Sequence, residues 1–202
     1  MSVTRISRSD SKARTRGGIL EAAHRVFLRR GFHAATLDEI ADEAGFTKGA
    51  VYSNFRNKDD LFLAVLGERY ERRAADYEAF VMQQDTPEET YRSIARYLLD
   101  AYRAEPDWWP LVSSFTTHAS RDPELRERLH ATRERFLDAL AGTIERVCAR
   151  YGMTFVLEPR EVARGTGALM RGMTLEWQVD PDSLRPDEFE EMLVAYLRGL
   201  GA

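Results

Sequence analysis

The sequence of 202 residues contains a single cysteine, Cys148, so no disulfide can form within the chain. Such low cysteine usage is typical of proteins from a reducing compartment. No stretch approaches the roughly 18 consecutive apolar residues that a membrane-spanning helix needs. The polar and basic N-terminal stretch also lacks the apolar run of a secretory signal. These absences predict a cytoplasmic protein without a membrane partner.

Other patterns are missing as well. No segment shows sustained alternation of apolar and polar residues, whereas apolar residues recur with the roughly 3.6-residue period of helices. The sequence therefore predicts an all-α fold. The segment GFTKGA lacks the spacing of a phosphate-binding loop, and we expect no cofactor.

The chain contains only three lysines, and all of them lie in the first 58 residues: Lys12, Lys48 and Lys58. Those residues contain 11 lysines and arginines against 6 acidic residues, whereas the remaining residues contain 18 against 27. A basic segment on an acidic body suits a domain that meets nucleic-acid phosphates. A basic disordered tail would explain the N-terminal arginines, but not Lys48 and Lys58.

Residues 36–62 have the pattern of two short helices joined by a tight turn and followed by a third helix. Thr36 and Glu39 have the spacing of a capping box, which starts the first helix. Gly45 can reverse the chain with a positive φ at low cost, and Thr47 can cap the second helix.

The second of these helices has two different faces. Val51 and Phe55 can point inward, so that Thr47, Lys48, Tyr52 and Asn54 lie on the surface. A helix-turn-helix presents its second helix to the DNA major groove in this way. An ordinary pair of surface helices would have similar caps, so the pattern alone does not separate the two interpretations.

The same segment resembles the DNA-binding region of the TetR family of bacterial transcriptional regulators. The similarity runs through T-x-x-x-I-A-x-x-A-G, T-K-G-A-V-Y-x-x-F and N-K-x-x-L-F, and it covers about residues 14–65 closely. The pair Ser53-Asn54 departs from the Tyr-His or similar pair that the family often has. The resemblance implies a three-helix DNA-binding domain in residues 1–57 and a six-helix bundle for effector binding and dimerisation in residues 58–202.

The resemblance and the surface position of these side chains together indicate the contacts with double-stranded DNA. Lys48 is expected to reach a base edge such as guanine O6 and N7, while other side chains hold phosphates. The expected DNA-binding residues are Thr36, Thr47, Lys48, Gly49, Tyr52, Asn54 and Lys58. One recognition helix reads few bases, so we expect a homodimer on a palindromic operator. The resemblance to this family favours repression over activation.

The remaining helices are expected to bind a partner subunit and an effector. Small residues in the helix predicted from Pro159 permit close packing, although the same residues could also pack within the chain. The expected dimer interface comprises Gly165, Ala168, Leu169, Gly172, Met173, Leu193 and Leu197. An apolar or aromatic effector is expected in a pocket with His118 as polar anchor. The expected pocket residues are Tyr91, Tyr102, Trp108, Trp109, Phe115, His118, Phe136, Met170 and Trp177.

Two other classes of function are the alternatives. Glu21-x-x-His24 and Glu127-x-x-His130 have the spacing that di-iron helical enzymes use. Both pairs lie opposite the apolar faces of their predicted helices, so we expect no metal site and no enzyme. A helical protein-interaction module in residues 83–202 would show an exposed apolar groove instead of an enclosed pocket, and the sequence leaves it open.

Overall fold

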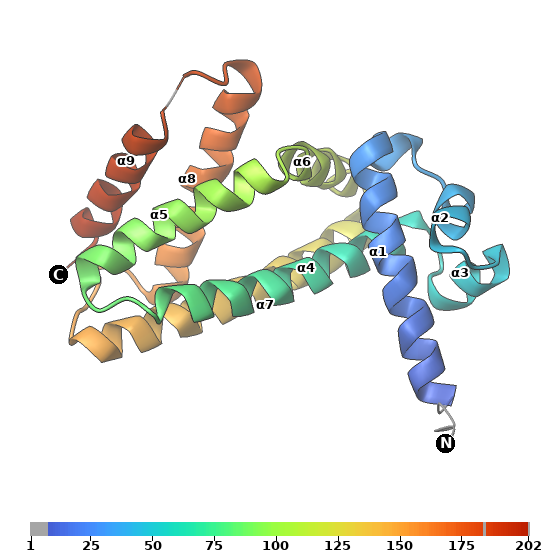
Figure 1. The fold of residues 1–202 in the computed structure, drawn as a ribbon, viewed down its shortest axis with the longest axis horizontal. Helices are drawn as coiled ribbons and strands as arrows, with labels where there is room; N and C mark the ends of the chain where they lie inside the picture. Colours follow the sequence, from blue (N-terminus) through green and yellow to red (C-terminus); the bar gives the residue numbers. More distant parts are fainter. Residues whose placement is uncertain (1–7, 184, 202) are drawn as a thin grey trace, which may run out of the picture. The chain divides into compact units, whose positions relative to one another are not determined.

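The computed structural model describes residues 8–183 and 185–201, and within them the chain forms nine α-helices (Figure 1). The helices are α1 (Arg8–Ala34), α2 (Leu37–Ala44), α3 (Lys48–Asn54), α4 (Lys58–Val81), α5 (Pro87–Ala104), α6 (Trp108–Ala119), α7 (Pro123–Tyr151), α8 (Pro159–Val179) and α9 (Pro186–Gly199). The only β-type pairing in the described ranges is an isolated bridge between Phe155 and Gly201. The predicted all-α fold is confirmed.

The described residues divide into two compact units. Unit 1 consists of the residues up to Arg69 together with Ser113–Leu129, and unit 2 consists of Tyr70–Val112 and the residues from His130 onward. Helices α4, α6 and α7 each contribute one end to unit 1 and the other end to unit 2. The division into residues 1–57 and 58–202 stays a prediction.

Unit 1 is held together by a cluster of phenylalanines. Phe62 of α4 stacks on Phe115 of α6, with ring centroids 4.2 Å apart. The edges of Phe27 and Phe32 meet Phe62 at 5.0 and 5.3 Å. All four side chains are at most 2% exposed. Aromatic pairs of this kind contribute about 0.5–1.5 kcal/mol each beyond the burial of their area, so the end of α6 is firmly packed in unit 1.

The start of α4 also holds polar partners within unit 1. Asn57 Oδ1 accepts from the amide of Asp60 at 2.8 Å, so its side chain caps the first turn of this helix. Asp59 Oδ1 lies 2.9 Å from His118 Nε2 of α6, and Asp60 accepts from Arg128 of α7. These contacts attach α6 and α7 to the helix that follows the turn.

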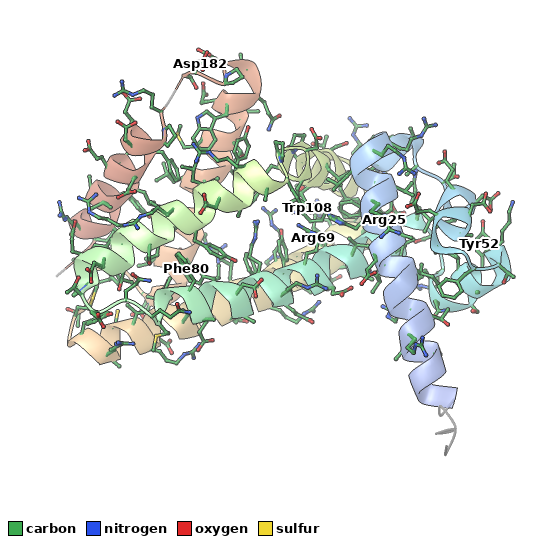
Figure 2. All side chains as sticks on the ribbon, viewed as in Figure 1. Arg25, Tyr52, Arg69, Phe80, Trp108 and Asp182 are labelled. Carbon is green, nitrogen blue, oxygen red and sulfur yellow. The ribbon has the colours of Figure 1, made fainter. Side chains whose placement is uncertain are left out.

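Unit 2 contains the rest of the apolar core. Helix α9 packs on α5, and α8 and α9 run in opposite directions, joined by the loop that contains Asp182 (Figures 1 and 2). Prolines occupy the first turns of α5, α8 and α9, where the missing amide hydrogen is not needed. Phe189, Leu193 and Leu197 of α9 are at most 2% exposed and centre this core.

Candidate functional site

The turn between α2 and α3 has the expected local chemistry. Thr36 Oγ1 accepts from the Glu39 amide at 3.1 Å, and Glu39 accepts from the Thr36 amide at 3.0 Å. Gly45 has φ 69° and ψ 25°, the left-handed conformation that glycine adopts at low cost. Thr47 Oγ1 accepts from the Ala50 amide at 3.2 Å. The predicted capping box, glycine turn and second cap are therefore confirmed.

Helix α3 has the two faces that its sequence predicts. Val51 and Phe55 are 0% and 2% exposed and pack inward. Tyr52, labelled in Figure 2, is 56% exposed, and Lys48 and Gly49 are also exposed. Because α2 and α3 contact α1 and each other, a small helical scaffold fixes the orientation of this exposed face.

Lys48 is exposed but already has a partner in the protein. Its Nζ lies 2.6 Å from Asp38 Oδ2 of α2. The hydrogen bond to Asp38, followed by the charge of that carboxylate, raises the pKa of Lys48. The side chain is fully charged at neutral pH, and Asp38 competes with DNA for this charge.

Asn54 is more restrained than its surface position in the sequence pattern suggests. Its Nδ2 donates to the Ala50 carbonyl of the same helix at 2.8 Å. Its Oδ1 is buried and has no hydrogen-bond partner among the described residues. A phosphate contact from this amide would have to replace a bond that the helix already provides.

Lys58 lies against protein carbonyls. Its Nζ donates to the His33 carbonyl at 2.8 Å and to the Ala35 carbonyl at 2.9 Å, and it lies 4.8 Å from the centroid of the Phe32 ring. Burial lowers the pKa of Lys58, and the charge of Asp59 acts in the opposite direction. Two of its three donors thus secure the segment that follows the last turn of α1, which the spacing of residues did not indicate.

Unit 2 contains a cavity of about 520 Å³. This volume is within the range of sites that hold small molecules. Of the nine residues expected in a pocket, four line the cavity: Tyr91, Trp109, Phe136 and Met170. The lining also contains residues that the sequence did not single out, among them Tyr70, Arg73, Arg133 and Arg171.

The other five expected pocket residues lie elsewhere. Tyr102 and Trp177 pack on each other with ring centroids 4.8 Å apart, and Trp108 is buried to 3% exposure outside the lining. Phe115 and His118 belong to unit 1, in the phenylalanine cluster and beside Asp59. Helical spacing shows which side chains point inward, but not which of them border an empty space.

The expected interface residues differ in how far they are exposed. Leu193 and Leu197 are 1% and 2% exposed in the core of unit 2, so they are not available to a partner. Gly165 lies against Tyr196 of α9: a Cβ at this position would be 2.1 Å from the tyrosine hydroxyl. Ala168 and Gly172 are exposed, whereas Leu169 and Met173 are half-buried against the core.

The alternative of a di-iron enzyme gains no support from the side chains. Glu21, Glu127 and His130 are exposed, and the described residues contain no group of three His, Cys, Asp or Glu side chains placed to hold a metal ion. None of the helices in the described ranges is both long and apolar enough to span a membrane.

Comparison with known proteins identifies both parts of the chain. Residues 19–65 match the family described as bacterial regulatory proteins, tetR family. Residues 87–202, more than half of the chain, match the family described as BetI-type transcriptional repressor, C-terminal.

Curated relatives are transcription factors. The HTH-type transcriptional activator FasR from Mycolicibacterium smegmatis is 29% identical over 131 residues, which is 65% of this chain and 59% of FasR. The HTH-type transcriptional regulator BetI from Brucella canis is 24% identical over 165 residues, which is 82% of this chain and 80% of BetI. The chain therefore spans less than two thirds of FasR but most of BetI.

Solved structures share the fold. The transcriptional regulator FadR from Bacillus subtilis, in complex with stearoyl-CoA, has a TM-score of 0.67 at 17% identity over 90% of this chain and 96% of its own. A transcriptional regulator from Saccharomonospora viridis, in complex with choline, has a TM-score of 0.71 at 21% identity over 94% of this chain and 98% of its own. With these matches in both parts, the chain belongs to the TetR family of DNA-binding transcriptional regulators, has a BetI-type C-terminal domain and is not an enzyme.

Proposed function

We propose that this protein is a ligand-responsive repressor, which binds a palindromic operator as a homodimer and leaves it when a small molecule occupies the cavity of unit 2. The observation that carries the proposal is the geometry of α2 and α3, where a capped glycine turn presents Lys48 and Tyr52 to solvent. The largely apolar cavity supports the effector part of the proposal.

The exposed side chains of α3 support a division of labour on DNA. Lys48 can donate to guanine O6 and N7 in the major groove once it leaves Asp38, and Gly49 allows a close approach of the backbone. Tyr52 can donate its hydroxyl to a phosphate, and the hydroxyls of Thr36 and Thr47 cap the first turns of α2 and α3. The amide of Asn54 and the ammonium group of Lys58 already donate to backbone carbonyls, which restricts their reach toward DNA.

The surface of α8 supports the dimer. Leu175 and Val179 are large apolar residues with 60% and 83% exposure. With Ala168 and Gly172 they recur at spacings of four, three and four residues, which places them on one face of the helix. An apolar stripe of this kind is suited to packing against a second copy of the chain, and it replaces Leu193 and Leu197 in our proposed interface.

Chain continuity supports the coupling between ligand and DNA. Helix α4 contains Tyr70 of the cavity lining and Phe62 of the phenylalanine cluster, and α6 likewise contains Trp109 and Phe115. A ligand that binds one arrangement of these helices better than another shifts the population of arrangements. We propose that the ligand-bound arrangement places the two recognition helices of the dimer out of register with the half-sites.

The names of the relatives include both a repressor and an activator. The C-terminal match is described as a repressor, whereas FasR is named an activator. We favour repression because the C-terminal match covers more than half of the chain. A reporter gene behind the selected operator distinguishes the two, since repression predicts higher expression when the regulator is deleted.

Selection of bound DNA from a random pool tests the proposal directly. The expected product is an inverted repeat whose half-sites lie about one helical turn apart or a multiple of it. The Lys48→Ala variant serves as the control, because it should lose the enrichment while retaining the fold. Enrichment of no sequence, or of a single unrepeated site by a monomer, contradicts the proposal.

A further inference from the structure

The lining of the unit 2 cavity is largely apolar, but it also contains several basic side chains. The basic and acidic residues of the lining are Arg73, His130, Arg133, Glu134, Arg164 and Arg171. Four of these side chains are arginines and one is a carboxylate. The protein therefore supplies the cavity with an excess of positive charge.

The single carboxylate does not balance the excess, because it already has partners. Glu134 accepts from Arg160, and His130 Nδ1 lies 3.8 Å from its other oxygen. Arg164 likewise has a carboxylate partner outside the lining, Glu161, at 3.4 Å. The lining contains three further arginines.

These three, Arg73, Arg133 and Arg171, form no ion pair with any acidic side chain in the part of the chain that the structure describes. They come from α4, α7 and α8, and their charges all act on Tyr70. Burial raises the pKa of the Tyr70 hydroxyl, and the three arginines lower it. The three guanidinium groups thus belong to the lining of one cavity and lie within electrostatic reach of Tyr70.

Arg171 shows what this grouping costs. The residue is exposed at the surface, yet partial desolvation of its guanidinium lowers its pKa, and the like charge of Arg133 lowers it further. Cations that are partly removed from water without a counterion destabilise the fold. A bound anion would remove this cost.

The rest of the lining is suited to an apolar body. Tyr70 stacks on Phe136 with ring centroids 4.4 Å apart and an interplanar angle of 9°. Aliphatic side chains continue the wall along α5 and α7: Ile94, Leu98, Leu137, Leu140, Ile144 and Val147. Burial of apolar surface is the main source of affinity in such a site.

The aromatic rings of the lining would also suit a cationic ligand, since quaternary ammonium groups bind to aromatic cages. However, the face of Trp109 already carries the guanidinium of Arg73, 5.3 Å from the ring centroid. Tyr77 and Tyr97 are engaged with each other at 5.6 Å. A ligand cation would therefore meet arginine charge without a carboxylate that is available to pair with it.

One buried donor supports an acceptor in the ligand. The indole Nε1 of Trp109 is buried and has no hydrogen-bond partner among the described residues. A buried donor without an acceptor is unfavourable, and a carboxylate or phosphate oxygen accepts strongly from such a group.

We propose that the effector is an amphiphile with an anionic head group and an extended apolar body, whose head group is held by Arg73, Arg133 and Arg171. This inference rests on the proposed function for the regulatory role of the ligand, and it adds the chemical class. A free fatty carboxylate and the coenzyme A thioester of the same acid share this chemistry. Choline, the ligand of one structural relative, does not.

Calorimetric titration of the full-length protein tests the charge preference. The probes are dodecanoate, dodecanoyl-coenzyme A, dodecanol and dodecyltrimethylammonium, each below its micelle-forming concentration. We expect at least one of the two anions to bind about 10-fold or more tightly than dodecanol, because charge-assisted hydrogen bonds add to the same apolar contact. The anion that binds more tightly identifies the source of the head group. Equal or tighter binding of dodecanol or of the ammonium probe overturns the proposal.

Substitutions connect the preference to the cavity. Arg133→Gln and Arg171→Gln are expected to reduce anion affinity about 5-fold or more while dodecanol affinity stays unchanged. Arg135→Gln is the matched control, because Arg135 is exposed on the same helix as Arg133 and lies outside the lining. Circular dichroism establishes that each variant is folded. A preference for anions that survives both cavity substitutions contradicts the assignment of the head group.

Operator binding in the same samples separates this inference from the proposed function. An anion that binds tightly but leaves operator affinity unchanged refutes the effector role, while the ligand class stands. Release of the operator by dodecanol or the ammonium probe, with no response to either anion, refutes the ligand class, while ligand-responsive regulation stands.

Discussion

Lys58 is the residue for which the sequence and the structure lead to different expectations, and Lys58→Met separates them. The resemblance to relatives assigns Lys58 to a DNA phosphate. The structure instead has its ammonium group donating to the carbonyls of His33 and Ala35 beside the Phe32 ring. Methionine retains most of the apolar stem and removes the donors. We therefore expect the substitution to act mainly on stability.

The magnitude follows from the contacts. A hydrogen bond to a charged group contributes about 1.5–3 kcal/mol when well buried. The lowered pKa of Lys58 shows that desolvation offsets part of this gain, and the residue is only half-buried. Taking about 1 kcal/mol for each bond gives about 2 kcal/mol in total. For a chain of this size that is a decrease in Tm of about 4–8 °C.

Denaturant unfolding followed by circular dichroism measures the loss of stability, and the salt dependence of operator binding measures the loss of phosphate contacts. We expect lower stability and an unchanged salt slope. Lys12→Met is the control, because it removes the same charge from an exposed lysine of α1. Unchanged stability together with a salt slope reduced by about 0.9 per half-site would refute the structural role and restore the phosphate contact.

Four further substitutions test the recognition helix, the scaffold and the dimer. Lys48→Ala should lower specific operator affinity about 5- to 150-fold and relax sequence choice. Asp38→Asn should strengthen binding to random DNA about 2- to 5-fold. Gel shifts that show no change in either variant contradict the assignment. Glu43→Gln tests acid stability: hydrogen bonds from Arg25 and then Arg29 lower the pKa of Glu43, so its stabilisation is complete above its usual pKa of 4.5 and is lost as the pH falls through the lowered value. The difference in Tm between wild type and variant should therefore be largest near neutral pH and shrink below pH 4.5, and a constant difference argues against the ion pairs. Leu175→Glu should convert the dimer to a monomer in sedimentation, and a dimer that survives excludes this face of α8.

The features that the sequence predicted correctly depend on neighbours in the chain. The Thr36 capping box, the Gly45 turn and the Thr47 cap all form within three or four residues. Local chemistry fixes them, so the helix-turn-helix can be derived from the sequence before the remaining packing is known.

The features that escaped prediction depend on residues brought together from distant helices. The partners of Lys58 are 23 and 25 residues away. Arg73, Arg133 and Arg171 each look like solvated charges on an amphipathic helix, and only the packing of three helices gathers them. For the same reason, periodicity could not tell the buried Leu193 from the exposed Leu175.

The ion pair between Lys48 and Asp38 has a consequence for how the protein searches a genome. When Lys48 of α3 approaches DNA, the carboxylate of Asp38 on α2 competes with the new partner. Backbone phosphates are the same at every site, whereas a guanine edge in register adds two aligned acceptors that only the operator offers. Asp38 therefore shortens the time that the protein stays on non-operator sites more than the time it stays on the operator. In this way a carboxylate that does not itself contact DNA contributes to sequence selectivity.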